Sequence, residues 1–204
     1  IDKNKLCSYL REMEFNRLLS LVISEYGEPS FSDKNFKSEN TVVQKKISKD
    51  QYSLIKNEEE IDELITQAHE IGEIAIDTET SSLNLNEAEL VGISICSKIG
   101  RAFYIPIGHK TGKCLKKDLV IKKLKPILED QSVKKIGQNI KFDFIVLFKN
   151  GITMNAMEDT MLMSYVLDAG KNRHNMDTLS EIHLNHKTIS FKEIVGIGKK
   201  QINF

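Results

Sequence analysis

Residues 74–83, "IAIDTETSSL", decide how this chain is interpreted. A short apolar strand begins at Ile74, and two acids follow it, Asp77 and Glu79, with one threonine between them. Residues two apart in a strand point to the same face, so both carboxylates project together and Thr78 points away. Adjacent carboxylates raise each other's pKa unless a cation lies between them. Hard divalent cations such as Mg²⁺ and Mn²⁺ take oxygen ligands of this kind, so the stretch is a candidate metal site.

A third acid lies in "IGQNIKFDF", residues 136–144. Asp143 falls in the first turns of a predicted helix between Phe142 and Phe144, where a charge beside apolar residues needs a partner. From the residues alone, two interpretations stay open. Asp143 is either an ordinary helix-start acid favoured by the helix dipole or a third carboxylate of the same cation site. The two strand acids are, likewise, also compatible with a solvated strand end.

The charges are unevenly distributed, although the formal net charge of the 204 residues is zero. Residues 57–90 carry eleven Asp or Glu and no Lys or Arg, whereas residues 110–149 carry eleven Lys and four acids. An acidic half and a basic half indicate a site for cations beside a surface for an anion. Taken alone, the lysines of "KKDLVIKKLK" are equally typical of a solvated helix face.

The composition also limits the setting of the protein. The three cysteines have no motif spacing, which fits a reducing compartment better than a disulfide framework. No apolar run approaches the roughly 20 residues that a membrane span needs. We therefore expect a cytoplasmic protein with no membrane partner.

Local patterns predict an α/β domain preceded by a helical segment and a polar linker. A helix is predicted over residues 5–23, and 40% of the chain is hydrophobic, enough for a sizeable core. The compact domain is expected to start near Tyr52 and to hold a mixed sheet flanked by helices. Its predicted elements are a helix over 57–70, antiparallel strands over 73–79, 90–97 and 101–107, a helix over 115–129, a strand over 134–138, and helices beginning near 140, 158 and 176.

Three separated blocks resemble the 3′–5′ exonuclease domain of bacterial, family A, DNA polymerase I. They are "AIDTETSSL", "IGQNIKFD" and "RHNMDTLSEIHLNHKTISF", and their order and spacing agree over residues 52–204. The opening "LREMEFNRLLSLV" resembles the end of the 5′ nuclease domain that precedes it in that family. The resemblance implies a nuclease-derived segment over 1–26, a linker over 27–51 and an exonuclease domain over 52–204. The implied fold is ribonuclease H-like (DnaQ-like), a mixed five-stranded sheet with helices around it.

The activity implied by the resemblance is proofreading, in which the 3′-terminal phosphodiester of DNA is hydrolysed. The implied mechanism uses two Mg²⁺ or Mn²⁺ ions, which activate water and stabilise the leaving oxygen. By resemblance, Asp77 bridges both ions, Glu79 holds the first and orients the water, and Asp143 serves the second. The implied partners are a single-stranded DNA 3′ end and the polymerase domain of the same full-length protein.

The resemblance also assigns residues to the substrate. Leu83 matches a residue that wedges against the terminal bases, and Phe191 matches an aromatic that packs on the single strand. Gln138, Asn139 and Arg173 match polar residues that contact DNA. Without the resemblance, Leu83 and Phe191 are as well explained by core packing, and Arg173 by a surface salt bridge.

The family's third motif, a Tyr followed four residues later by Asp, is expected shortly beyond Phe204. Tyr165 and Asp168 have the wrong spacing for it, and Asp159 does not obviously replace it. The expectation is therefore weak or no exonuclease activity for this chain alone. Two alternatives stay open: a ribonuclease D-like RNA 3′ exonuclease, and a catalytically inactive scaffold or DNA-end-binding domain.

Overall fold

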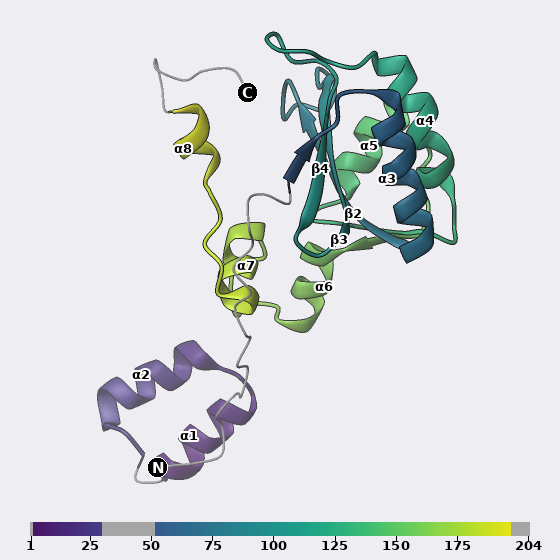
Figure 1. Cartoon of the computed structure of the whole chain (residues 1–204). Helices are drawn as coiled ribbons and strands as arrows, with labels where there is room; N and C mark the ends of the chain where they lie inside the picture. The colour runs from purple at the N-terminus through teal and green to yellow at the C-terminus, as the bar shows by residue number, and fades with distance from the viewer. Residues whose placement is uncertain (1, 30–51, 197–204) are drawn as a thin grey trace. The chain divides into compact units, whose positions relative to one another are not determined.

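The computed structural model describes residues 2–29 and 52–196, and the chain divides into two compact units, Ile1–Thr41 and Val42–Phe204 (Figure 1). Most of the predicted linker over 27–51 lies outside the described residues. Within the described parts, no helix has both the length and the apolar character that crossing a membrane requires.

The first unit is a pair of helices, α1 (Lys3–Glu12) and α2 (Asn16–Tyr26). The prediction of one helix over 5–23 is therefore wrong. Glu14 adopts a left-handed backbone conformation, with φ of 56°, and a right-handed helix cannot continue through it. The Phe15 N–H instead donates to the Leu10 carbonyl at 2.8 Å, which turns the chain into the second helix.

The second unit contains a six-stranded sheet with the order β1-β4-β3-β2-β5-β6. The central meander β2–β3–β4 is antiparallel, as predicted, and the pairs β1–β4, β2–β5 and β5–β6 are parallel. The strands are β1 (Tyr52–Leu54), β2 (Glu73–Thr80), β3 (Leu90–Lys98), β4 (Arg101–Pro106), β5 (Lys134–Gly137) and β6 (Met157–Asp159). The resemblance implies five strands. The sequence does not predict β1 and β6, because three residues are too few for a periodic pattern.

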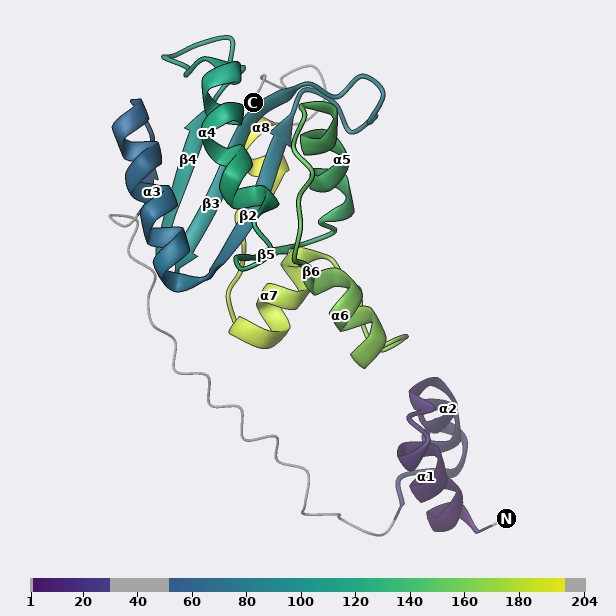
Figure 2. The same ribbon diagram turned by 90° about the vertical axis from the view of Figure 1, so that its right-hand side faces the viewer.

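The helices of this unit are α3 (Glu58–Ile71), α4 (Lys117–Glu129), α5 (Lys141–Lys149), α6 (Thr160–Leu167), α7 (Met176–Leu184) and α8 (Phe191–Val195). Figures 1 and 2 show α3, α4 and α5 on one side of the sheet, where α3 packs on β2 and β3, α5 packs on β2, and α4 packs against α3. Asn57 caps α3 as predicted, since its side chain accepts the Glu60 N–H at 3.0 Å. Gly72 ends α3 in a left-handed conformation and leads directly into β2.

Some of the uneven charge is used inside the fold. Lys123 on α4 donates to both carboxylate oxygens of Asp62 on α3, at 2.8 and 2.7 Å, so part of the acidic half faces part of the basic half. Lys135 on β5 is fully buried on the helix side, and its Nζ donates to the carbonyls of Asp130 and Val133 at 2.5 and 2.7 Å. These two lysines therefore serve the fold and do not contribute to an anion-binding surface.

Candidate active site

Successive side chains of strand β2 alternate between a buried face and a partly exposed face of the sheet. Ile74, Ile76 and Thr78 are buried toward the helices, whereas Asp77 and Glu79 project from the opposite face and are half-buried. On the neighbouring strand β3, the residues paired with these two acids are Ser94 and Gly92. The predicted shared orientation of the two carboxylates is thus present, and the β3 residues directly opposite them are small.

Asp143 reaches the same strand from the first turn of α5. It is 3% exposed, and its Oδ1 accepts the Thr78 backbone N–H at 2.8 Å and the Thr78 hydroxyl at 2.6 Å. The β2–β5 pairing ends at Ala75 and Ile136, and α5 follows soon after, so its first acid meets the next part of β2. Asp143 therefore joins β2 at the residue between Asp77 and Glu79.

The three carboxylates are coupled electrostatically. Burial, then the charge of Asp143 and then that of Glu79 raise the pKa of Asp77 to about 7. Burial and the charge of Asp143 also raise the pKa of Glu79, against a lowering effect of His109. Burial raises the pKa of Asp143 although the Thr78 hydrogen bonds oppose it. A cation near all three would relieve this mutual repulsion.

The chemistry of this acid cluster fits a hard divalent cation, because every donor is a carboxylate oxygen. In the described part of the chain, no group of three or more Asp, Glu, His or Cys side chains is placed so that it could hold a metal ion. Asp143 Oδ1 is engaged twice by Thr78. Asp77, Glu79 and Asp143, the ligands expected from the sequence, are therefore coupled by charge but do not lie as a ready-made three-ligand metal site.

A tight network fixes the loop between β5 and α5. Asn139 has a left-handed φ of 58°, and its N–H and that of Ile140 donate to the Asp159 carboxylate at 3.0 and 3.1 Å. The same carboxylate caps α6 by accepting the Met161 N–H at 2.9 Å. Asp159 therefore couples the start of α6 to the start of the helix that carries Asp143. The sequence places Asp159 near the start of a predicted helix, but nothing in it indicates the hydrogen bonds to Asn139 and Ile140.

Gln138 is held at both ends of its amide. Its Nε2 donates to the His174 carbonyl at 2.7 Å, and its Oε1 accepts the Thr160 hydroxyl at 2.6 Å. The neighbour of His174 is Arg173, which is exposed. In this arrangement Gln138 anchors the segment that carries Arg173.

Two further predicted substrate residues lie on other segments than the strand and the helix that carry the acids. Leu83 is 90% exposed in the turn after β2, which excludes core packing as the reason for its presence. Phe191 is the first residue of α8, and its side chain lies outside the described residues. The structure thus brings the three acids together and leaves the two apolar substrate candidates on separate segments.

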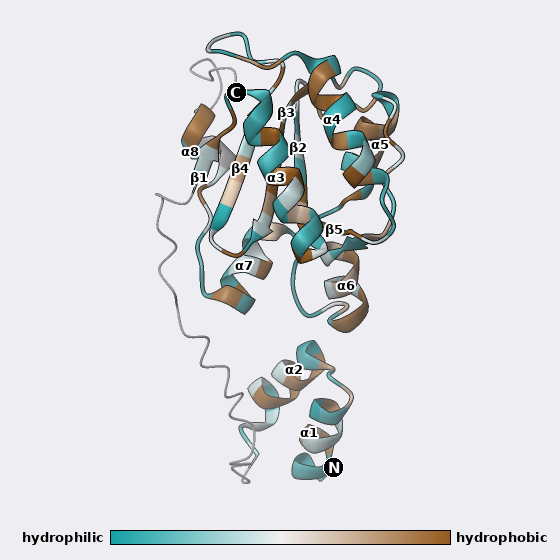
Figure 3. Cartoon of the chain, turned by 45° about the vertical axis from the view of Figure 1, so that its right-hand side comes forward, coloured by the Kyte–Doolittle hydropathy of each residue, from teal (hydrophilic) through white to brown (hydrophobic). Residues whose placement is uncertain are grey.

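The acid-bearing face opens into an apolar groove of about 740 Å³. The groove runs from the middle of the sheet to α6 and α7, and α6 is mostly hydrophobic along its length in Figure 3. Its lining includes Asp77, Ser94, Gln138, Met163, Leu179 and His183. Asp77, one acid of the cluster, therefore lines this groove directly.

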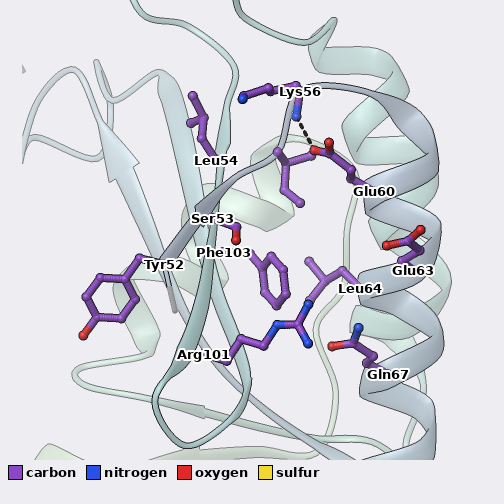
Figure 4. A pocket seen from close by; sticks show the side chains of 11 residues that line it. Tyr52, Ser53, Leu54, Lys56, Glu60, Glu63, Leu64, Gln67, Arg101 and Phe103 are labelled. Carbon is purple, nitrogen blue, oxygen red and sulfur yellow. Dashed lines mark hydrogen bonds between the residues drawn. The ribbon is translucent and has the colours of Figure 1, made fainter. Parts of the chain in front are cut away.

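A second depression, of about 430 Å³, lies between edge strand β1 and α3 (Figure 4). The Arg101 guanidinium lies 5.2 Å from the centre of the Phe103 ring, and the Lys56 N–H donates to the Glu60 carboxylate at 2.7 Å. None of the three acids of the cluster lines this depression. It is separate from the candidate active site.

The sequence profile of the 3′–5′ exonuclease family matches residues 52–204, three quarters of the chain. The chain belongs to the 3′–5′ exonucleases of family A DNA polymerase I. DNA polymerase I of Pseudomonas aeruginosa is 36% identical over 210 residues, covering 100% of this chain and 22% of the relative. DNA polymerase I of Rhizobium leguminosarum is 40% identical over 177 residues, covering 75% of this chain and 17% of the relative. The exonuclease chain thus spans about a fifth of the length of these relatives.

Solved structures confirm the predicted fold class. Brucella melitensis NrnC with bound Mg²⁺ superimposes with a TM-score of 0.53 at 22% identity, covering 73% of this chain and 68% of that one. Trypanosoma brucei RNase D superimposes with a TM-score of 0.57 at 16% identity, covering 71% of this chain and 53% of that one. At these identities the likeness shows the ribonuclease H-like fold alone.

Proposed function

We propose that this exonuclease removes nucleotides from the 3′ end of single-stranded DNA, and that Asp77, Glu79 and Asp143 hold the divalent cations it needs. The observation that carries the proposal is the coupled acid cluster, in which the pKa of Asp77 is raised to about 7. The DNA polymerase I relatives support the choice of DNA, and the Mg²⁺-bound NrnC structure supports the choice of Mg²⁺. Mn²⁺ is included because it takes the same oxygen ligands.

In this proposal, the bound cations, two in the complete site, would lower the pKa of the attacking water and offset charge on the scissile phosphate. Asp77 and Glu79 face the substrate side together because they are two residues apart on β2. Thr78 holds Asp143 in place from the other side of the strand. The Thr78 contacts thereby hold the Asp143 carboxyl group in a fixed place before substrate arrives.

The substrate residues form a second part of the proposal. In the proposal, Leu83 presents an exposed apolar side chain to the terminal bases of the DNA. Phe191 is the aromatic residue that contacts the single-stranded DNA. Asn139 and Arg173 contact the backbone of the DNA, and Gln138 orients the Arg173 segment. The chain acts as part of a longer cytoplasmic polymerase I that proofreads its own product; the free state of Cys7, Cys96 and Cys114 is consistent with that location.

The test compares 5′-labelled single-stranded DNA and RNA of one sequence, each with Mg²⁺ or Mn²⁺. We expect this chain to shorten DNA weakly from its 3′ end and Asp77→Asn to reduce that weak rate by at least about a hundredfold, since even a residue that only orients a metal ligand is worth 10–100-fold. Asp62→Asn is the matched control, because Asp62 lies on α3 and pairs with Lys123.

Three outcomes would contradict the proposal. Preferential shortening of RNA would favour the ribonuclease D-like alternative. DNA binding without any metal-dependent hydrolysis, followed by fluorescence anisotropy, would favour a scaffold or DNA-end-binding domain. An equal loss in Asp62→Asn would show that the effect of Asp77→Asn is not specific to the acid cluster.

A further inference from the structure

A tyrosine and a histidine lie beside the acid cluster without being assigned to it. Tyr104 on β4 pairs with Ser94 on β3, which in turn pairs with Asp77 on β2, so all three lie in one row across the same face. In the adjacent row, Gly92 on β3 pairs with Glu79. The face that carries the acids thus also carries the Tyr104 ring.

The Tyr104 ring crosses from its own row to the row of Glu79. A Cβ atom built on Gly92 would lie 2.0 Å from the Tyr104 Oη, far inside any real contact. The hydroxyl therefore lies directly over Gly92, the residue that faces Glu79 across the β2–β3 pair. Glycine is the residue that leaves this space, since any side chain at position 92 would displace the ring.

His109 holds the Tyr104 hydroxyl by a hydrogen bond. Its Nε2 shares a 2.6 Å hydrogen bond with Tyr104 Oη, and the two rings meet edge to face with centroids 5.6 Å apart. The segment just before His109 is anchored to β3, because the Gly108 N–H donates to the Val91 carbonyl at 2.8 Å. Both side chains of the pair are part-buried and therefore restricted in rotation.

The charges show that this pair is within electrostatic reach of Glu79. Burial and then the negative charge of Glu79 raise the pKa of Tyr104 to about 12, so the phenol keeps its hydrogen at neutral pH. Conversely, the positive charge that His109 carries when protonated opposes the rise in the pKa of Glu79. Hydrogen-bonded groups behind a metal-binding carboxylate commonly set its orientation.

We propose that Tyr104 and His109 are positioning residues for Glu79: His109 holds the Tyr104 hydroxyl over Gly92, and that hydroxyl orients the Glu79 carboxylate toward the cation site. The inference deepens the proposed function and rests on it. It assigns no contact with substrate to either residue.

The experiment measures Mn²⁺ binding to the full chain by isothermal titration calorimetry, beside the melting temperature without metal. We expect Tyr104→Phe to weaken Mn²⁺ binding about tenfold, within the range for partners of metal ligands. Because the ring stays, the metal-free melting temperature should change by no more than about 2 °C. Tyr52→Phe is the matched control, a hydroxyl deletion on the exposed edge strand β1, and should bind Mn²⁺ like the unchanged chain.

Four further variants separate positioning from packing. Gly92→Ala should weaken Mn²⁺ binding to a similar extent, because it displaces the Tyr104 ring while leaving its hydroxyl in the chain. His109→Gln, which retains a hydrogen-bonding group, should bind Mn²⁺ more tightly than His109→Ala does. The double variant Tyr104→Phe/His109→Ala should bind Mn²⁺ no more weakly than Tyr104→Phe alone, since His109 acts only through the Tyr104 hydroxyl and residues acting as one unit are not additive.

The outcomes distinguish this inference from the proposed function. If Tyr104→Phe and both His109 variants bind Mn²⁺ like the unchanged chain while Asp77→Asn does not bind, the inference is wrong and the acid cluster stands. If the unchanged chain and Asp77→Asn bind Mn²⁺ alike, the proposed metal site itself fails, and the inference with it. If Tyr104→Phe weakens Mn²⁺ binding and also lowers the metal-free melting temperature, its effect could come from lost packing. Mn²⁺ binding by His109→Ala equal to that of the unchanged chain would then overturn the positioning role.

Discussion

The two faces of the central meander are made from alternate residues of the same three strands, yet they have opposite chemistry. The helix-covered face presents Ile93 and Ile95, which are among the most buried residues of the chain. The other face presents Asp77 and Glu79, whose carboxyl pKa values are raised by burial and by mutual repulsion. One-residue alternation thus separates the groups that stabilise the sheet from groups whose charge destabilises it.

This difference matters because the first face supplies the rigidity that the second face needs. Burying apolar surface contributes about 25 cal/mol per Å², so the isoleucine-rich face stabilises the fold broadly. Holding acids close together without a cation destabilises the fold, because their charges repel each other. The two faces should therefore respond differently to substitution, to pH and to metal.

The largest expected effect on stability comes from the helix-covered face. Ile93 is 0% exposed, and Ile93→Ala should lower the free energy of unfolding by about 2–5 kcal/mol, for lost burial and a residual cavity. Ser94→Ala, one residue along and on the other face, should change it by less than about 0.5 kcal/mol. Chemical denaturation of both variants checks the contrast, and equal losses would refute the division of roles between the faces.

The next effect is a pH dependence that should originate from the acid face. The folded-state pKa of Asp77, about 7, is above its ordinary value of 3.8, so its stabilising contribution is complete below the lower value and is lost as pH rises through the upper one. Glu79 and Asp143 shift in the same direction. The metal-free chain should therefore melt at a lower temperature at about pH 8 than at about pH 5.

Metal removal and one substitution sharpen this second prediction. Added Mg²⁺ should raise the melting temperature at about pH 8 more than at about pH 5, because protonated carboxyls bind cations poorly. Asp77→Asn should flatten the pH dependence and reduce the Mg²⁺ effect. A melting temperature that rises with pH in the unchanged, metal-free chain would contradict the assigned pKa direction.

A smaller effect should come from the network that supports the acid face. Asp159→Ala removes the acceptor of the Asn139, Ile140 and Met161 N–H groups and should cost about 1–2 kcal/mol, as for other helix caps. It should also weaken DNA binding, because Asn139 loses its fixed conformation. Thermal denaturation and fluorescence anisotropy measure the two effects, and Asp168→Ala, at the end of α6, is the control.

The sequence predicts those parts of the fold and the site that depend on residues close together in the chain, and it does not predict contacts between distant residues. The alternation in "IAIDTE" was enough to place Asp77 and Glu79 on one face, because period-two geometry is local. It was also enough to predict the meander and the Asn57 cap. The engagement of Asp143 by Thr78 spans 65 positions and leaves no local pattern, and the same holds for the Tyr104 ring over Gly92, which depends on a three-strand register. The break at Glu14 was missed since apolar spacing continues through it.

The smallest expected effect on stability belongs to a residue that serves neither face. Leu83 is 90% exposed, so Leu83→Ala should leave the free energy of unfolding within about 0.5 kcal/mol of the unchanged chain. If Leu83 contacts terminal bases, the same change should weaken single-stranded DNA binding about tenfold, equivalent to about 1.4 kcal/mol. Fluorescence anisotropy with a labelled oligonucleotide in EDTA measures this without hydrolysis. Ile99→Ala is the matched control, an aliphatic residue that is 97% exposed in the β3–β4 turn. Equal weakening in both variants would mean that exposed apolar surface, and not the position of Leu83 after the acid strand, accounts for the binding.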